Sequence, residues 1–305
     1  PILDKKGEIQ NLSKLVKPNL AIITNISEAH LKNFNNVKDI AKAKAEIINN
    51  ITEGGSIILN KDGKFYDFLS NQAQNKKINV ISFSAKKKAD ISLIKIIKLK
   101  NNYRIKVLVN SKIFYFNIKN STKSFINNVL ACISTLHVLD LDLRRIERKL
   151  IHFITPEGRG DVRIVKKFNK RFKFIDESYN ANPLSMKSAI NNMSYYKRKG
   201  NSQKLVLLGD MLELGQNSEK LHRDLSRFLN KSDIDKVFVC GKHIKKTYDF
   251  LHTNKKGKIF NNLNEAYNQF SKILHNNDLL MVKGSNATGL NKFSKNIKRG
   301  QLSVI

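Results

Sequence analysis

The stretch Phe174-Ile-Asp-Glu-Ser-Tyr-Asn-Ala-Asn-Pro183 predicts a strand, a loop and a helix in immediate succession. The apolar-rich run from Arg171 to Ile175 predicts a strand that stops at Asp176, and residues 183–193 predict the helix that follows, with Asn182 as its cap. In an open α/β sheet, ligands bind at such corners, and a helix start offers N–H groups to an anion. Asp176 could accept hydrogen bonds from sugar hydroxyls there. An ordinary loop followed by a helix cap would explain the same residues.

Length and composition bound the class of protein. The chain has 305 residues, enough for two domains, and begins with Pro1. It contains no apolar run of about 18 residues and no signal peptide, so we expect a soluble, cytoplasmic protein without a membrane span. Cys132 and Cys240 stand singly in apolar stretches without metal-like spacing, which predicts two buried, reduced thiols.

The charge balance is strongly basic, with 56 Lys and Arg against 25 Asp and Glu, a formal net charge of +31. Such a field favours nucleic acid, an anionic membrane or a polyanionic substrate. The excess is almost all lysine, however, and it is scattered through every segment together with many Asn and Ile, as a compositional bias would leave it. The aromatic residues do not interleave with the basic ones as a base-stacking platform requires. We therefore expect no specific nucleic-acid partner, and a basic nucleic-acid-binding protein is an alternative supported by charge alone.

Upstream of the opening stretch, the hydrophobic pattern predicts a βα-type sheet followed by an antiparallel meander. A period of two between Ala89 and Ile118 marks the meander. The predicted helices cover 7–16, 37–51, 62–72, 123–139 and 143–153, and the predicted strands cover 20–24, 56–59, 78–83, 91–97, 103–109 and 113–118.

Thr155-Pro-Glu-Gly-Arg-Gly160 is the predicted linker, because Pro and two Gly break both periods. It divides the chain into domains 1–154 and 155–305. The alternation restarts beyond it and predicts a Rossmann-like α/β domain. Its predicted strands are 161–166, 171–175, 204–208, 236–240, 258–260 and 278–282, and its predicted helices are 183–193, 218–229, 242–251, 263–274 and one from 288.

Two residues of the first domain are candidates for chemistry. His30 lies just past the carboxyl end of the strand 20–24, and Lys44 stands among small residues in Ala41-Lys-Ala-Lys-Ala-Glu46. Taken singly, His30 fits a hydrogen-bonding loop residue and Lys44 fits a solvated lysine.

Taken together with three later motifs, they resemble the Mur ligase family of ATP-dependent amide ligases. The motifs are Asp176-Glu-Ser-Tyr-Asn-Ala-Asn-Pro-Leu-Ser-Met186, Leu208-Gly-Asp-Met-Leu-Glu-Leu-Gly215 with His222 after it, and Val282-Lys-Gly-Ser285. The resemblance covers essentially the whole chain, in the family's order. It implies the remainder of a P-loop-type central ATPase domain with a small antiparallel meander, followed by a Rossmann-like C-terminal domain.

The motifs of the second half look like those of the members that add D-alanyl-D-alanine to UDP-N-acetylmuramoyl-tripeptide in peptidoglycan precursor synthesis. The resemblance implies ATP and Mg²⁺ as cofactors and an acyl-phosphate intermediate. We expect a monomer. A ligase that adds another amino acid, or a folate-type glutamate, is the alternative within the same superfamily.

The resemblance also implies roles for individual residues. His30 would help to hold magnesium, and Lys44 would be the family's carbamylated lysine, whose oxygens suit a hard cation. Arg159 would reach the ATP phosphates, its two neighbouring glycines permitting a hinge. Asp176 would accept the ribose hydroxyls, and Asn128 would lie near the adenine.

Other residues are assigned less narrowly by the resemblance. Tyr179, Asn180 and Asn182 would line the cleft for the nucleotide and the incoming dipeptide. Asp210 and Glu213 would orient the incoming amine or only stabilise their loop. Lys283 would serve phosphate or substrate, or would cap a helix near Gly284.

Two departures from the family pattern, and one further match to it, shape the expectations. The sequence has no Gly-x-x-x-x-Gly-Lys-[Ser/Thr] motif. Lys6-Gly-Glu-Ile9 matches the segment that follows a metal-binding Glu, so we expect the chain to start midway through the ATPase domain and not to catalyse by itself. Thr122-Lys-Ser-Phe125 stands where the family carries Gly-x-His-Asn, which leaves the adenine contacts and the strength of nucleotide binding open.

Overall fold

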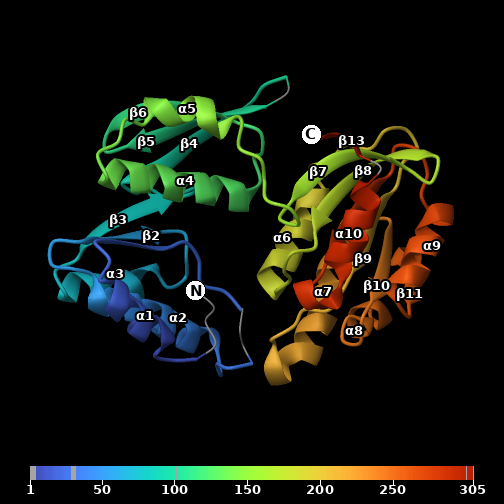
Figure 1. Cartoon of the computed structure of the whole chain (residues 1–305), viewed down its shortest axis with the longest axis horizontal. Coiled ribbons are helices and arrows are strands. Elements are labelled where there is room, and N and C mark those ends of the chain that lie inside the picture. The colour runs from blue at the N-terminus through green and yellow to red at the C-terminus, as the bar shows by residue number, and fades with distance from the viewer. Residues whose placement is uncertain (1–4, 29–31, 101, 300, 305) are drawn as a thin grey trace. The chain divides into compact units, whose positions relative to one another are not determined.

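The computed structural model describes residues 5–28, 32–100, 102–299 and 301–304. The chain divides into two compact units, Pro1–Ile154 and Thr155–Ile305, which we describe one at a time (Figure 1). None of the helices in the described ranges is long and apolar enough to cross a membrane.

The first unit is built on a six-stranded sheet of order β1-β2-β3-β4-β5-β6. Strands β1 to β4 pair in parallel, and β4, β5 and β6 form the predicted antiparallel meander. The six-residue loop between β3 and β4 suffices for a parallel pair because only Phe83 and Ser84 pair with β4. The strands are β1 Leu20–Ile23, β2 Ser56–Asn60, β3 Asn79–Ser84, β4 Ile91–Lys98, β5 Tyr103–Val109 and β6 Lys112–Ile118.

Helices cover both faces of this sheet. Ile57 and Leu59 of β2 pack with Leu69 and Ala73 of α3 on one face, and Ile58 packs in the cluster that includes α4 on the other. Successive side chains of a strand point to opposite faces of the sheet, so a strand between two layers of helices is apolar on both faces. The helices are α1 Glu8–Val16, α2 Val37–Ala45, the 3₁₀ helix η1 Glu46–Asn50, α3 Tyr66–Asn75, α4 Lys123–Val138 and α5 Arg144–Leu150.

Three helix predictions in this unit were wrong in extent. The helix predicted over 143–153 spans Arg144–Leu150. The helix predicted over 37–51 is regular only to Ala45 and continues as η1. The helix predicted from Asp62 begins at Tyr66, because the Asp62 carboxylate accepts hydrogen bonds from Ser84 Oγ (2.6 Å) and the Ala85 amide (2.9 Å). Asp62 thereby joins the loops after β2 and β3 and does not start a helix.

The second unit is a seven-stranded sheet of order β11-β10-β9-β12-β8-β7-β13. Strands β8 to β12 are mutually parallel in the order given, β7 forms an antiparallel hairpin with β8, and β13 pairs antiparallel with β7. β13 was not predicted. The strands are β7 Asp161–Lys167, β8 Lys170–Glu177, β9 Lys204–Leu208, β10 Lys236–Cys240, β11 Lys256–Phe260, β12 Leu279–Lys283 and β13 Gln301–Val304.

Neighbouring side chains of the central strands point to opposite faces. Val206 and Leu208 pack in the cluster that includes α6 and α7, and Leu205 and Leu207 pack in the cluster that includes α9 and α10. The result is the predicted Rossmann-like α/β layer arrangement (Figure 1). The helices are α6 Pro183–Met193, α7 Ser218–Lys231, α8 Lys245–Asp249, α9 Leu263–Ile273 and α10 Leu290–Lys298, with 3₁₀ turns η2 Gly215–Asn217, η3 Thr253–Lys255 and η4 Asn286–Thr288.

The prediction that both cysteines are buried was wrong. Cys132 is exposed and Cys240 is partly exposed. In α4 the residues 129–131 and 133 face the core, and the helical period of 3.6 turns Cys132 outward. The apolar residues around Cys132 therefore did not indicate that its own side chain lies on the exposed face of α4.

Candidate functional site

The carboxyl ends of β8, β12, β9 and β10 meet at one edge of the second sheet, and the polar motifs lie there. β8 does not stop at Asp176, as predicted, but extends to Glu177, which pairs with Lys283 at the end of β12. Lys283 in turn pairs with Leu208 at the end of β9. The order of the strands thus places Lys283 beside Asp176 and Glu177, although it comes from a different motif.

Asp176 is buried, with 2% of its surface exposed. Its Oδ1 accepts hydrogen bonds from Ser178 Oγ (2.6 Å) and the Ser178 amide (3.1 Å), and its Oδ2 lies 2.8 Å from Lys298 Nζ. Both carboxylate oxygens are therefore engaged within the unit. Because the side chain is also buried, a direct bond to a ribose hydroxyl would require the groups that cover it to move.

Glu177 is the carboxylate of this corner that reaches the surface, with its side chain 21% exposed. Its Oε2 lies 3.3 Å from Lys283 Nζ, which also donates to the Asn180 carbonyl (2.8 Å). Burial lowers the pKa of Lys283, and the charge of Glu177 opposes that effect. Lys283 thus fixes the loop after β8, and its predicted alternative as a helix-capping lysine was wrong.

Arg159 is exposed, and its guanidinium lies 4.0 Å from the centre of the Tyr179 ring. The backbone beneath this pair is closely packed, because the Tyr179 amide donates to the Gly158 carbonyl (3.0 Å) and the Gly160 amide donates to the Asp176 carbonyl (2.9 Å). A Cβ on Gly158 would lie 2.8 Å from the Tyr179 nitrogen. Gly158 is therefore needed for close approach to the loop after β8, which is a different role from the predicted hinge.

Asn182 caps α6 as predicted. Its side chain accepts from the Ser185 amide (2.8 Å), and Ser185 Oγ accepts from the Asn182 amide (3.0 Å), with Pro183 at the first helical position. The Ser185 amide is thus satisfied and Pro183 has no N–H, so the helix start offers fewer donors to an anion than the sequence suggested. Asn180 is exposed, and its Oδ1 accepts from the Ala181 amide (2.7 Å).

Asp210 stabilises a neighbouring loop. Its carboxylate accepts hydrogen bonds from the backbone amides of Lys242, His243 and Ile244, at 3.1, 2.9 and 2.7 Å. This turn occupies the start of the helix predicted over 242–251, which is why α8 begins only at Lys245. Of the two roles left open for Asp210, the contacts support loop stabilisation.

His222 holds the other side of the same loop and is fully buried. Its Nε2 accepts from the Met211 amide (3.0 Å), so its proton is on Nδ1, which lies 2.7 Å from the Ser218 carbonyl. Burial lowers the pKa of His222 and outweighs the opposing hydrogen bond to Ser218 and charge of Asp210. A neutral histidine therefore fixes the 208–215 motif in place.

In the first unit Lys44 lies on α2, and its Nζ donates to the Asn25 carbonyl (2.8 Å) just past β1. Burial lowers the pKa of the Lys44 amine. His30, predicted as its partner, lies outside the described residues. Asn128 is exposed in the first turns of α4. Within the described part of the chain, no three His, Cys, Asp or Glu side chains gather as a metal site.

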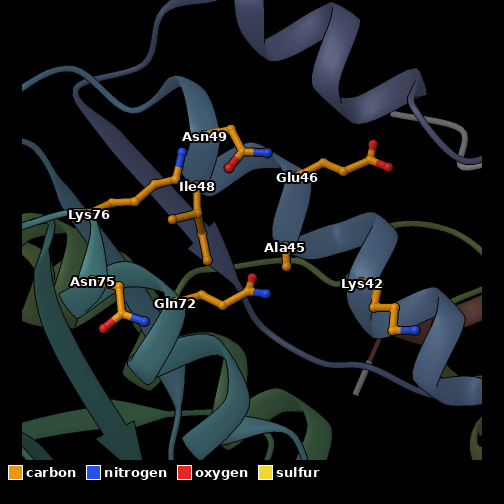
Figure 2. A pocket seen from close by; sticks show the side chains of 8 residues that line it. All are labelled: Lys42, Ala45, Glu46, Ile48, Asn49, Gln72, Asn75 and Lys76. Atoms are coloured by element: carbon orange, nitrogen blue, oxygen red, sulfur yellow. The ribbon is translucent and has the colours of Figure 1, made fainter.

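A pocket of about 310 Å³ lies elsewhere in the first unit, between α2, η1 and the end of α3 (Figure 2). Lys42, Glu46 and Asn49 line it from one side and Gln72, Asn75 and Lys76 from the other. Lys42 and Lys44 are two positions apart on α2, so they point to different sides of that helix. The pocket is therefore separate from the surroundings of Lys44.

Comparison with known proteins places these features in a family. The architecture defines an α/β protein with polar motifs at the carboxyl ends of its strands. Residues 4–136 match the Mur ligase middle domain, and residues 162–286 match the Mur ligase, glutamate ligase domain. The chain belongs to the Mur ligase family.

Individual proteins that are similar to the chain are members of the same family. The chain is 32% identical to the UDP-N-acetylmuramoyl-tripeptide--D-alanyl-D-alanine ligase of Rickettsia prowazekii, over 95% of this chain and 63% of that protein. It is 30% identical to the ligase of the same name from Buchnera aphidicola, over 93% of this chain and 59% of that protein. A crystal structure of MurF from Acinetobacter baumannii is similar with a TM-score of 0.83 and 25% identity, over 97% of this chain and 63% of that one. The chain thus spans about three fifths of the length of these relatives.

Glu177 and Lys298 are the residues of the site that sequence reasoning missed. Glu177 lies within the motif 176–186, and a predicted strand that ended at Glu177 would have placed it at the carboxyl end of β8. Lys298 carries no local signal, because a lysine at a helix end is common in so lysine-rich a chain.

Proposed function

We propose that the chain carries part of an ATP-dependent ligase that joins D-alanyl-D-alanine to UDP-N-acetylmuramoyl-tripeptide through an acyl phosphate, as a monomer in the cytoplasm. The observation that carries the proposal is the gathering of three separate motifs at one edge of the second sheet. The segment from Lys283 to Ser285 hydrogen-bonds there to both of the others: Lys283 Nζ donates to the Asn180 carbonyl (2.8 Å), and Ser285 Oγ accepts from the Leu212 amide (2.9 Å). The names of the relatives support the choice of substrates.

The exposed groups at this edge suit a nucleotide. The Arg159 guanidinium provides a fixed positive charge and planar donors that match phosphate oxygens. Glu177 provides a carboxylate oxygen for a sugar hydroxyl. Tyr179 and Asn180 add exposed side chains that could contact a base or the incoming dipeptide. Asn128 and Asn182 retain the nucleotide-side roles proposed from the resemblance, Asn182 by shaping the start of α6.

The surroundings of Lys44 fit the carbamate that the resemblance implies. Carbon dioxide reacts with the neutral amine, and burial of Lys44 favours that form by lowering its pKa. Once carbamylated, Lys44 would present oxygen ligands for Mg²⁺ together with His30, and the ion would supply charge neutralisation for phosphoryl transfer. Within the described structure, Lys44 itself is held at the end of β1 by the Asn25 carbonyl.

The test uses a chimera in which this chain replaces the matching portion of the Rickettsia prowazekii ligase. We expect the chimera to release ADP and to form the UDP-linked pentapeptide only when ATP, the tripeptide precursor and D-alanyl-D-alanine are all present. Arg159→Ala should reduce the rate by at least tenfold. A folded chimera without any ligation would refute the proposal.

The choice of amino-acid substrate is tested in the same assay. Replacing D-alanyl-D-alanine by L-lysine, diaminopimelate or glutamate should give no product. Activity with one of these and none with the dipeptide would support the alternative ligase of the same family. Added DNA or heparin should have no effect on ligation beyond that of salt.

A further inference from the structure

Five charged side chains form a cluster near the segment 157–160 of the second unit. They are Glu157, Asp161, Arg163, Asp176 and Lys298. Lys298, the last residue of α10, has its Nζ 2.8 Å from Asp176 Oδ2, 3.2 Å from Glu157 Oε1 and 3.7 Å from Asp161 Oδ2. Arg163 joins the same carboxylates, with its Nε 2.8 Å from Asp161 Oδ2 and an Nη 4.0 Å from Glu157 Oε1. Lys298 therefore contacts all three carboxylates.

Three members of the cluster are buried, whereas Arg163 is 17% exposed and Glu157 lies at the surface with 61% of its side chain exposed. Asp161 and Asp176 are 3% and 2% exposed, and the Lys298 side chain is 7% exposed. Burial acts to lower the pKa of Lys298, but the hydrogen bonds and charges of Asp176 and Glu157 outweigh it and raise the pKa. Lys298 is thus charged, and its removal would leave three carboxylates beside one arginine.

The contacts of the cluster converge on the segment 157–160. Lys298 binds the Glu157 side chain and Asp176, and the Asp176 carbonyl accepts from the Gly160 amide. On the other side, the Gly158 carbonyl accepts from the Tyr179 amide, and Arg159 lies over the Tyr179 ring. Lys298, more than a hundred positions further along the chain, therefore contacts Glu157 at one end of the short segment that presents Arg159, and it contacts the side chain of Asp176, whose carbonyl binds the other end.

We propose that Lys298 is a positioning residue for Arg159: its ammonium joins Glu157, Asp161 and Asp176 so that the segment 157–160 stays docked on β8. The docking concerns the second unit alone. The consequence for ligand binding rests on the proposed function, because it assumes that Arg159 contacts the nucleotide.

The first experiment measures docking without any ligand, by hydrogen exchange of the full chain. Lys298→Met should speed exchange of the Gly160 and Tyr179 amides at least tenfold more than exchange of peptides from β9 and β10. Lys295→Met removes an exposed lysine from the same helix. It should not change the exchange of the Gly160 and Tyr179 amides or of the peptides from β9 and β10. Lys298→Arg should restore most of the protection. Unchanged exchange in Lys298→Met, or equal acceleration throughout the unit, would overturn the proposal.

The second experiment measures the consequence in the chimera, as the dissociation constant for ATP. Lys298→Met should weaken binding by about the same factor as Arg159→Ala, and the double variant should be no weaker than Arg159→Ala alone. A merely structural role for Lys298 would add a further loss in the double variant, and that result would overturn the proposal. If Arg159→Ala itself left ATP binding unchanged, the nucleotide role of Arg159 would fail, and the exchange experiment would still decide the docking role of Lys298.

Discussion

Replacing Gly158 by alanine should destabilise the second unit far more than the same change at Gly200. Both glycines have positive φ, +74° at Gly158 and +55° at Gly200. An added Cβ at Gly158 meets the Tyr179 backbone nitrogen at 2.8 Å, whereas at Gly200 nothing lies within 4 Å. The pair therefore separates the cost of the backbone conformation from the cost of the contact.

The magnitudes follow from these two terms. A non-glycine residue in the left-handed region costs about 1–2 kcal/mol, which is the whole expected effect at Gly200. At Gly158 the contact adds about 1–3 kcal/mol or more, because the neighbour is backbone and its hydrogen bond to the Gly158 carbonyl must lengthen. We expect about 2–5 kcal/mol in total for Gly158→Ala.

Urea unfolding followed by circular dichroism, compared at the transition of the second unit, measures both losses. Hydrogen exchange of peptides from this unit identifies which transition belongs to it. Equal destabilisation by the two substitutions would refute the reasoning, since it would mean that the segment 157–160 does not pack on the loop after β8.

Three further predictions concern single side chains. Lys44→Ala should abolish ligation by the chimera with little change in its urea midpoint, and retained ligation would exclude the carbamate. Asp176→Ala should weaken ATP binding, measured by calorimetry, and should also cost about 3–5 kcal/mol in urea unfolding, because it leaves the buried Lys298 without its nearest carboxylate; unchanged stability would contradict the ion pair. The stabilisation that neutral His222 provides should be complete above about pH 6.5, the ordinary pKa, and should decline as the pH falls below it, because the folded-state pKa is lowered. Urea midpoints at pH 7.5 and 5.5 should therefore differ more in the wild type than in His222→Gln, and equal differences would contradict it.

Much of the fold could be predicted because it is encoded locally. The change of period at Ala89 marked the meander, and the Asn182-Pro183 pair marked the start of α6. The errors arose where a distant side chain competes with local preference. Asp62 bonds to the loop after β3 and so delays α3, and Asp210 bonds to the turn before α8 and so shortens that helix.

The candidate site could be predicted only as a set of motifs. Sequence spacing indicated that Asp176 and Lys283 each follow a strand, and parallel pairing of β8 with β12 brings those strand ends together. It could not show which side chains are buried there. Asp176 and Glu177 are adjacent in the chain and differ in exposure because successive residues of a strand point to opposite faces.

At this edge of the second sheet the side chains form two layers, which should respond differently to substitution. The inner layer contains Asp176 with Lys298, and Lys283 beneath the loop after β8; its charges are satisfied within the protein, so substitutions there should lower stability and ligand affinity together. The outer layer contains Arg159 and Tyr179, which are exposed and contact each other mainly by stacking, so substitutions there should lower ligand affinity with little loss of stability. The net charge of +31 does not distinguish the layers, because nearly all of it lies on scattered lysines. What makes Lys283 and Lys298 functional candidates among so many lysines is that each is buried against specific oxygen atoms at the strand ends.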